Sequence, residues 1–327
     1  MTETSHRTDT SDTPASAGPH PSIAFIGLGN MGGPMAANLV AAGYTVHGFD
    51  LVPEALEAAR AAGVEIAASG ADAVRAATSG NRGLVITMLP AGKHVLGAYR
   101  GSDATEGLLT AAAQNTLFMD CSTIAVEDAR NLHEIATAAG HRTLDAPVSG
   151  GTVGAEAGTL TMMVGGAEAD FEEVRPVLDV VGRNVVHCGQ PGNGLAAKVC
   201  NNLILGASMI AVSEAFVLGE KLGLSNEALY DVASSATGQC WALTTNCPVP
   251  GPVPTSPANR DYQPGFAAAL MAKDLGLAKH AIETTGTQSQ IGLLAEEIYA
   301  AFAQGEGGTK DFSGIIELIR DRSGHPA

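Results

Sequence analysis

A lysine and an amide share one face of an apolar segment in the middle of the chain. Lys198 and Asn202 are four residues apart, so in a helix they lie on the same side. Their neighbours are apolar: Leu195, Ala196, Ala197, Val199, Leu203 and Ile204. Burial lowers the pKa of a lysine and suits it to proton transfer, whereas on a solvated face it would only be a charged surface residue. The apolar neighbours favour a general acid and base.

A second segment could hold a carboxylate. Residues 145–151 read DAPVSGG, so a proline is followed by a serine and two glycines. Gly150 and Gly151 leave backbone N–H groups uncovered, and Ser149 adds a hydroxyl donor. Such a turn can bind an anion, but the same residues also suit a flexible turn without a ligand. The pattern alone leaves both interpretations open.

A glycine-rich loop follows the first apolar segment of the chain. The loop is Gly27-Leu28-Gly29-Asn30-Met31-Gly32, between a predicted strand at 22–26 and a predicted helix at 32–42. The first glycine permits a tight turn, the second lets a pyrophosphate approach, and the third lets helix and strand pack closely. The helix N-terminus then offers free N–H groups to phosphates. This context predicts a dinucleotide site.

An acidic residue extends this site. Asp50 ends the second predicted strand, 45–50, and the next residues are Leu51 and Val52 rather than an arginine. A carboxylate here accepts hydrogen bonds from the ribose hydroxyls and repels a 2′-phosphate. The sequence therefore favours NAD over NADP. A glycine turn with an incidental acid is the alternative.

Two further strand ends should lie at the same edge of the sheet. Met88-Leu89-Pro90 and Cys121-Ser122-Thr123 each follow an apolar run, and ligands bind at the carboxyl ends of parallel strands. Ordinary strand termination is the alternative.

Hydride transfer between an alcohol and nicotinamide needs a group that takes the hydroxyl proton. Without metal ligands or a placed His–Asp pair, Lys198 is the best candidate.

Strands and helices alternate in the first half of the chain and give way to helices in the second. Further strands are predicted at 84–88, 117–121, 143–146, 160–164 and 185–187, with helices at 53–63, 125–139 and 168–180. Further helices are predicted at 193–222, 226–234, 265–285, 288–304 and 312–321, around a proline-rich loop at 246–264. We expect an α/β Rossmann-type doubly wound sheet at 22–190 and an all-α domain at 191–322, with tails at 1–21 (disordered) and 323–327.

Composition limits the partners and the compartment. The net charge of −16 disfavours nucleic acid and anionic membranes, and no uninterrupted apolar run is long enough to cross a bilayer. The five cysteines are odd in number and form no CxxC pair, which disfavours a disulfide framework or a zinc site. The N-terminal residues lack the features of a secretory or mitochondrial signal. We expect a cytoplasmic protein.

Four motifs resemble those of the β-hydroxyacid dehydrogenase family, and of its 3-hydroxyisobutyrate dehydrogenases in particular. They are FIGLGNMGGPMAANL at 25–39, DAPVSGG at 145–151, KVCNN at 198–202 and MAKDL at 271–275. Cys240-Trp241 and the proline-rich loop resemble that subgroup as well. The resemblance covers residues 22 to 321.

The resemblance implies a role for each candidate residue. Lys198 would be the acid and base, Asn202 would orient it and the substrate, and Ser149, Gly150 and Gly151 would hold the substrate carboxylate. Lys273 would lie at the closed cleft. The residues expected to line the cofactor are Leu89, Pro90, His94 and Thr123. Trp241 would form an apolar wall near the substrate, or would be a core tryptophan.

The resemblance also implies a reaction, the NAD-dependent oxidation of (S)-3-hydroxyisobutyrate to methylmalonate semialdehyde in valine breakdown. A tartronate or succinic semialdehyde reductase would share all four motifs. Imine reductases of this fold usually lack the lysine, which is present here. A catalytically silent NAD-binding protein would have no reason to keep the lysine–amide pair. An alanine-rich helical domain suggests a homodimer or homotetramer.

Overall fold

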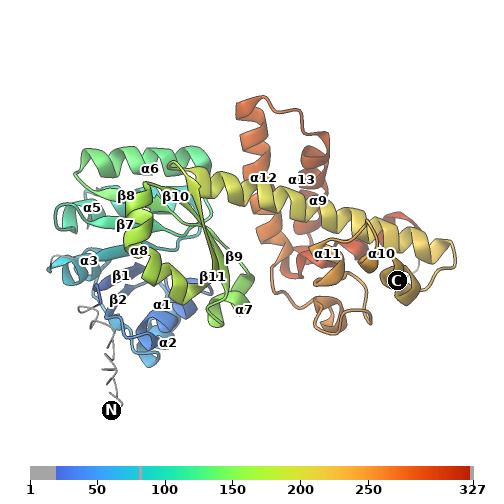
Figure 1. Cartoon of the computed structure of the whole chain (residues 1–327), viewed down its shortest axis with the longest axis horizontal. Coiled ribbons are helices and arrows are strands. Elements are labelled where there is room, and N and C mark those ends of the chain that lie inside the picture. The colour runs from blue at the N-terminus through green and yellow to red at the C-terminus, as the bar shows by residue number, and fades with distance from the viewer. Residues whose placement is uncertain (1–19, 81–82, 325–327) are drawn as a thin grey trace, which may run out of the picture.

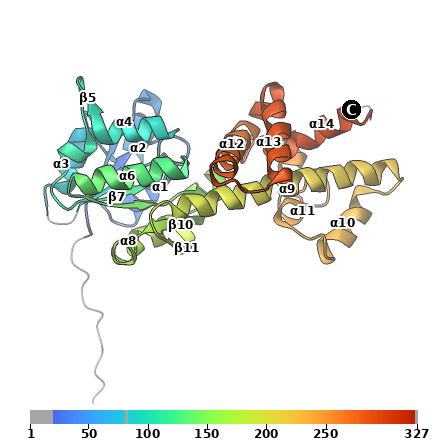
Figure 2. The same ribbon diagram turned by 90° about the horizontal axis from the view of Figure 1, so that it is seen from above.

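The computed structural model describes residues 20–80 and 83–324. A sheet covered by helices forms the first part and a group of helices the second, and one long helix runs from the first part along the second (Figure 1). Figure 2 shows this helix, α9 (Asn193–Lys221), extending away from the sheet. Residues 1–19 and 325–327 of the predicted tails lie outside the described residues. The ring centroid of His20 lies 4.4 Å from that of Tyr44, in a tilted arrangement.

The main sheet runs in the order β11-β10-β8-β7-β4-β1-β2-β3, and β9 pairs with β10. All pairs from β8 to β3 are parallel, whereas β10 is antiparallel to β8 and β9. The strands are β1 Ile23–Ile26, β2 Val46–Phe49, β3 Glu65–Ile66, β4 Leu84–Thr87, β7 Leu117–Asp120, β8 Arg142–Asp145, β9 Val148–Ser149, β10 Leu160–Gly166 and β11 Gly182–Gly189. A separate short hairpin consists of β5 Gly101–Ser102 and β6 Thr105–Glu106.

Helices cover both faces of this sheet. They are α1 Gly32–Ala41, α2 Pro53–Ala61, α3 Gly70–Thr78, α4 Gly92–Arg100, α5 Leu108–Ala111, α6 Val126–Ala138, α7 Gly151–Glu156 and α8 Glu168–Val181. Alternate residues of β1 show the arrangement, because Phe25 packs with the core of α1 and α8 and Ala24 packs with that of α3, α4 and α6. The predicted doubly wound α/β domain is therefore confirmed. Sequence analysis did not predict α3 or α4.

The second part contains helices and no strand among its described residues, apart from one isolated bridge between Ala267 and Asp311. Besides α9, its elements are α10 Asn226–Ser235, α11 Trp241–Thr244, η1 Pro257–Arg260, α12 Ala268–Thr285, α13 Gln290–Ala303, η2 Glu306–Thr309, η3 Phe312–Gly314 and α14 Ile315–Arg322. The predicted all-helical domain is confirmed. Its sheet-side boundary lies between the end of β11 at Gly189 and the start of α9 at Asn193.

Helix α9 has the length and the mean hydropathy, 1.6, of a helix that could cross a membrane. In the described part of the chain it alone passes this test, and half of its most apolar stretch is buried inside the protein. Residues such as Met209 and Ile210 pack against α12, α13 and α14 in the core of the second part. The apolar character of α9 is therefore that of a core helix.

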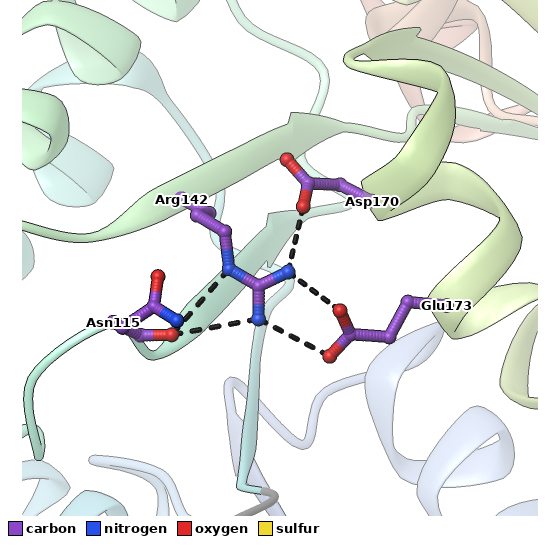
Figure 3. Close-up of polar contacts among 4 residues, drawn as sticks. All are labelled: Asn115, Arg142, Asp170 and Glu173. Carbon is purple, nitrogen blue, oxygen red and sulfur yellow. Dashed lines mark hydrogen bonds and ion pairs between the residues drawn. The ribbon is translucent and has the colours of Figure 1, made fainter.

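An arginine ties the outer part of the sheet to α8. The guanidinium of Arg142, at the start of β8, donates to Asp170 and Glu173 on α8 and to the backbone oxygen of Asn115 (Figure 3). These carboxylates raise the pKa of Arg142 above its ordinary value, with Glu173 contributing most. Because Asp170 is mostly buried, this network is less screened by solvent than an exposed ion pair.

A buried carboxylate organises the helical part. Asp311 is 1% exposed and accepts five hydrogen bonds. Its Oδ1 accepts from the Asn246 amide and from the backbone and hydroxyl of Ser313, and its Oδ2 accepts from the N–H groups of Gly265 and Phe266. These last two bonds explain why α12 begins at Ala268 rather than at the predicted Gly265. Asp311 thus joins the proline-rich loop, the start of α12 and η3.

We predict that Asp311→Asn destabilises the protein by about 2–4 kcal/mol, because an amide nitrogen would replace one acceptor oxygen and face buried donors. Urea unfolding followed by circular dichroism measures this change. Asp321→Asn, at an exposed position on α14, is the matched control and should leave the midpoint unchanged. An equal midpoint for both variants would show that the Asp311 carboxylate contributes little.

Candidate active site

The three glycines of the first loop differ in the space around them. A Cβ on Gly27 would lie 2.2 Å from the Met88 carbonyl oxygen, and one on Gly32 would lie 1.9 Å from that of Gly27. A Cβ on Gly29 would meet no atom within 4 Å. Gly27 also has a φ of +97°, which disfavours a side chain. Two glycines are therefore required by packing, and Gly29 leaves open space where a pyrophosphate can approach.

The start of α1 fits an anionic ligand. Its N-cap, Met31, makes no side-chain cap hydrogen bond, and the first turn contains no acidic residue. The N-terminal N–H groups of a helix carry partial positive charge and favour phosphate. Leu28 is buried and Asn30 is exposed, so the loop runs from the core to the surface. This arrangement suits the pyrophosphate of a dinucleotide.

Asp50 lies beside this loop. Its Oδ2 accepts from the Leu28 N–H at 2.6 Å and its Oδ1 from the Val52 N–H at 2.9 Å. Asp50 therefore connects the glycine-rich loop to the loop after β2. The neighbouring Leu51 and Val52 are exposed. Both hydrogen bonds come from backbone N–H groups, and a carboxylate at this position disfavours a 2′-phosphate.

A buried acid supports the loop after β4. Asp120, at the end of β7, is 1% exposed and accepts from the hydroxyls of Thr87 and Ser122. The Ser122 oxygen in turn accepts from the Leu89 N–H at 2.8 Å. Burial raises the pKa of Asp120 to about 6, against the hydrogen bonds that lower it. This chain of bonds fixes Leu89 and the following Pro90 at the carboxyl edge of the sheet.

The predicted carboxylate loop has a backbone that requires glycine. Gly150 and Gly151 have φ values of +140° and +64°, in the region that side chains disfavour. A Cβ on Gly151 would also lie 2.9 Å from the backbone oxygen of Gly265, just before α12. Ser149 is partly exposed and Gly150 is exposed. The loop thus presents its polar groups at the boundary of the two parts.

Lys198 is buried, as its apolar neighbours indicate. It is 6% exposed and lies near the start of α9, beside the fully buried Leu195. Its Nζ lies 3.9 Å from Oδ2 of Asp274, and no hydrogen bond joins it to another described residue. Burial lowers the pKa of Lys198, the Asp274 charge acts in the opposite direction, and Lys273 lowers it further. This amine is therefore closer to neutrality than an exposed lysine.

Asp274 is a residue of the site to which sequence analysis gave no role. It is 6% exposed and accepts a hydrogen bond from the Asn202 amide as well as facing Lys198. Burial raises its pKa, and the two lysines, Lys198 first, lower it. The KD pair within MAKDL at 271–275 was the available signal. Lys198, Asn202 and Asp274 thus form one buried polar cluster between α9 and α12.

Lys273 connects the two parts of the protein. Its Nζ donates to the Pro90 carbonyl oxygen at 2.8 Å, from α12 to the loop after β4. The same helix makes a second contact with the first part of the protein, because Nε2 of His280 on α12 lies 3.6 Å from Oε2 of Glu127 on α6. The structure therefore places Lys273 at the cofactor edge of the sheet, near the Leu89–Pro90 loop.

The remaining predicted residues lie at different depths. Thr123 follows Ser122 and is partly buried, while His94 is an exposed residue of α4. Trp241 begins α11 and is 51% exposed, so it is not a core tryptophan. Cys240 beside it lines a hollow together with Val212 of α9. Val212 lies about 20 Å along that helix from Lys198.

Among the described residues, no group of three or more His, Cys, Asp or Glu side chains could hold a metal ion. The five cysteines, all within the described ranges, are free.

Two family models match the two parts of the chain. Residues 22–189 match the NAD-binding domain of 6-phosphogluconate dehydrogenase. Residues 192–319 match the NAD-binding domain of NADP-dependent 3-hydroxyisobutyrate dehydrogenase. Together they span the sheet and the helical part described above.

Relatives and solved structures agree with these models. The chain is 52% identical to a probable 3-hydroxyisobutyrate dehydrogenase of Mycobacterium tuberculosis, over 92% of this chain and 98% of that protein. It is 46% identical to an NAD-dependent L-serine dehydrogenase of Pseudomonas aeruginosa, over 92% of this chain and 99% of that protein. The structure of M. tuberculosis 3-hydroxyisobutyrate dehydrogenase with L-serine matches with a TM-score of 0.86, over 92% of this chain and 99% of that one.

The imine reductases share the fold alone. A Streptomyces aurantiacus imine reductase is 19% identical, with a TM-score of 0.57 over 91% of this chain and 99% of that one. The much higher identity to the dehydrogenases, over nearly the whole length of both chains, decides the assignment. The chain belongs to the 3-hydroxyisobutyrate dehydrogenase family and is an NAD-dependent dehydrogenase.

Proposed function

We propose that this enzyme oxidises (S)-3-hydroxyisobutyrate to methylmalonate semialdehyde, a step of valine breakdown, with Lys198 as the general acid and base. The observation that carries the proposal is the buried amine of Lys198, 3.9 Å from Asp274, on a helix whose first turn is bonded to Asp145, the first residue of the motif DAPVSGG. NAD, when bound, would supply the hydride acceptor of this reaction, C4 of its nicotinamide.

Lys198 performs the proton transfer of this reaction. Its neutral amine accepts the proton of the substrate hydroxyl as the adjacent carbon loses its hydride, so the C–O single bond becomes a carbonyl. In the reverse direction the ammonium returns the proton to the carbonyl oxygen. Burial lowers the pKa of Lys198, which makes the neutral form accessible. Asn202, bonded to Asp274, holds the cluster in place.

The substrate and the cofactor occupy neighbouring sites in this proposal. The N–H groups of Gly150 and Gly151 and the Ser149 hydroxyl hold the substrate carboxylate. Residues 27–32 and Asp50 hold the pyrophosphate and the adenosine ribose. Leu89, Pro90, Thr123 and Lys273 lie along the nicotinamide half, with His94 at its margin. Trp241 keeps a proposed role as an apolar wall of the substrate site.

L-Serine is the second candidate substrate, because one relative is an L-serine dehydrogenase and another was solved with L-serine. Serine shares the carboxylate and the primary hydroxyl but has an ammonium where 3-hydroxyisobutyrate has a methyl group. NAD reduction with 3-hydroxyisobutyrate, L-serine, glycerate, 3-hydroxypropionate and 4-hydroxybutyrate distinguishes the candidates. A clear preference for serine or glycerate would move the enzyme to another branch of the family.

We further propose a cytoplasmic homodimer or homotetramer. The acidic net charge, −16, disfavours nucleic acid as a partner. Exposed apolar side chains on the helical part, among them Leu218, Leu222 and Ile291, are consistent with burial between copies. Sedimentation at several protein concentrations measures the oligomeric state.

We predict that Lys198→Ala lowers kcat by at least ~100-fold, as expected for the loss of a general base. Steady-state NADH formation measures kcat, and fluorescence quenching by NADH checks that the cofactor site is intact. Lys221→Ala, at the opposite end of α9, is the control and should keep normal turnover. Near-normal turnover of Lys198→Ala would contradict the assignment.

We predict that Asp274→Asn shifts the pH profile of oxidation to lower pH. The Asp274 charge raises the pKa of Lys198, so its removal lowers that pKa further. Oxidation requires the neutral amine, and kcat/KM should therefore rise with pH at a lower midpoint than in the wild type. Glu283→Gln, on the exposed face of α12, is the control. An unmoved midpoint would show that Asp274 does not tune Lys198.

We predict that Gly29→Ala weakens NAD binding at least about 10-fold, a cost near 1.4 kcal/mol, without loss of stability. The added methyl group meets no protein atom within 4 Å but occupies the approach of the pyrophosphate. Calorimetric titration with NAD and thermal unfolding measure the two effects. Gly97→Ala, which adds a methyl group in open space on α4, should change neither. Wild-type affinity of Gly29→Ala would place the pyrophosphate elsewhere.

A further inference from the structure

The carboxylate of Asp145 binds the first turn of the helix that carries Lys198. Asp145 is 6% exposed and ends β8. Its Oδ1 accepts from the Gly192 N–H at 2.7 Å and its Oδ2 from the Leu195 N–H at 3.0 Å. Gly192 is the N-cap of α9 and has no side chain with which to cap the helix. A residue 47 positions earlier in the chain therefore supplies the cap.

Two glycines make room for this contact. A Cβ on Gly194 would lie 2.3 Å from the Met163 carbonyl oxygen and 2.8 Å from Oδ2 of Asp145. A Cβ on Gly165, in β10, would lie 2.5 Å from Oδ1 of the same carboxylate. A side chain at either position would push α9 away from the sheet. The surroundings of Asp145 are thus packed around both of its oxygens.

The same residue begins the loop that holds the substrate. Residues 146–151 follow Asp145 directly, and this short segment includes the Ser149–Gly151 turn. The Ala146 N–H donates to the Asp120 backbone oxygen at 2.7 Å, which fixes the start of the loop on β7. Asp145 therefore contacts the first turn of α9 and anchors the substrate loop at a single point.

We propose that Asp145 is a positioning residue of the reaction, which sets where Lys198 lies relative to the turn at Ser149–Gly151. Leu195 precedes Lys198 by about one helical turn, so movement of the first turn carries the amine with it. The inference rests on the proposed role of Lys198. It assigns to the first residue of the DAPVSGG motif a role apart from substrate contact.

The effect of Asp145 on Lys198 runs through the backbone. The charged groups that act on Lys198 are Asp274 and Lys273, both on α12, and Asp145 is not among them. Replacement of Asp145 therefore changes the environment of Lys198 by moving α9. A residue that only stabilised the fold would leave the chemistry of the folded enzyme unaltered.

Kinetics of Asp145→Asn and Asp145→Ala, below their melting temperatures, test the proposal. We expect kcat with the hydroxyacid to fall by about 10-fold in the first variant and about 100-fold in the second, with an unchanged KM for NAD. Asn keeps one acceptor and should lose less. Tyr299→Phe is the control, because it removes a buried hydrogen bond, from α13 to the Phe312 oxygen, that involves neither Asp145 nor α9. It should lose stability and keep kcat.

Gly194→Ala provides an independent variant that retains the Asp145 charge. Its methyl group displaces the first turn of α9, so we expect the same fall in kcat with an unchanged KM for NAD. Normal kcat in folded Gly194→Ala and Asp145→Asn would overturn the proposal, even if Asp145→Ala failed to fold.

A second measurement does not depend on the substrate. The chain has six lysines, so carbon-13 labelling of lysine Cε followed by NMR resolves the titration of Lys198, assigned by its loss in Lys198→Arg. In the Asp145 variants we expect the pKa of Lys198 to rise toward 10.5 as the loosened turn admits water, and to stay unchanged in Tyr299→Phe.

If the wild type oxidised no hydroxyacid, the proposed function would fail. An unshifted Lys198 titration in the variants would still refute the positioning role, and a shifted one would support it.

Discussion

The burial of one amine is the constraint on which the rest of this structure depends. An ammonium in apolar surroundings loses solvation, which lowers the pKa of Lys198, and a nearby carboxylate restores part of that loss. Asp274 supplies this carboxylate from a different helix, and Asn202 donates to it. The balance leaves a lysine that can lose its proton while it remains in place. Such an amine can exchange protons with a hydroxyl group.

Helix α9 carries this amine and connects the two parts of the protein. The helix starts directly after the sheet and continues into the core of the helical part, so it belongs to both (Figure 1). Its first turn is bonded to Asp145, and a bond from Lys273 to Pro90 joins α12 to the cofactor edge. The buried lysine cluster is thereby tied to the carboxyl edge of the sheet.

The cofactor loop depends on the absence of side chains for two separate reasons. Gly27 and Gly32 are required because neighbouring backbone would collide with a Cβ, whereas Gly29 lies in open space. A loop that was merely tight would crowd all three positions. The start of α1 beside Gly29 gives that space a function, because the positive end of the helix dipole favours phosphate oxygens.

Local sequence determined much of this protein. Apolar runs, glycine stops and the GxGxxG loop predicted the sheet and the long helix within a few residues, because periodicity and turn chemistry act over short distances. The same periodicity put Lys198 and Asn202 on one face. It did not predict α3, for which the Ser69 cap is only a weak local signal.

Tertiary structure decided the partners of these residues. Asp274 lies 72 positions after Asn202, and the two ends of the Asp145 contact are 47 positions apart, so packing of separate elements brings them together. Trp241 illustrates the same limit, since its sequence neighbours do not reveal that it is half exposed. Spacing in sequence specifies which residues share an element, but distances between elements depend on how their side chains pack.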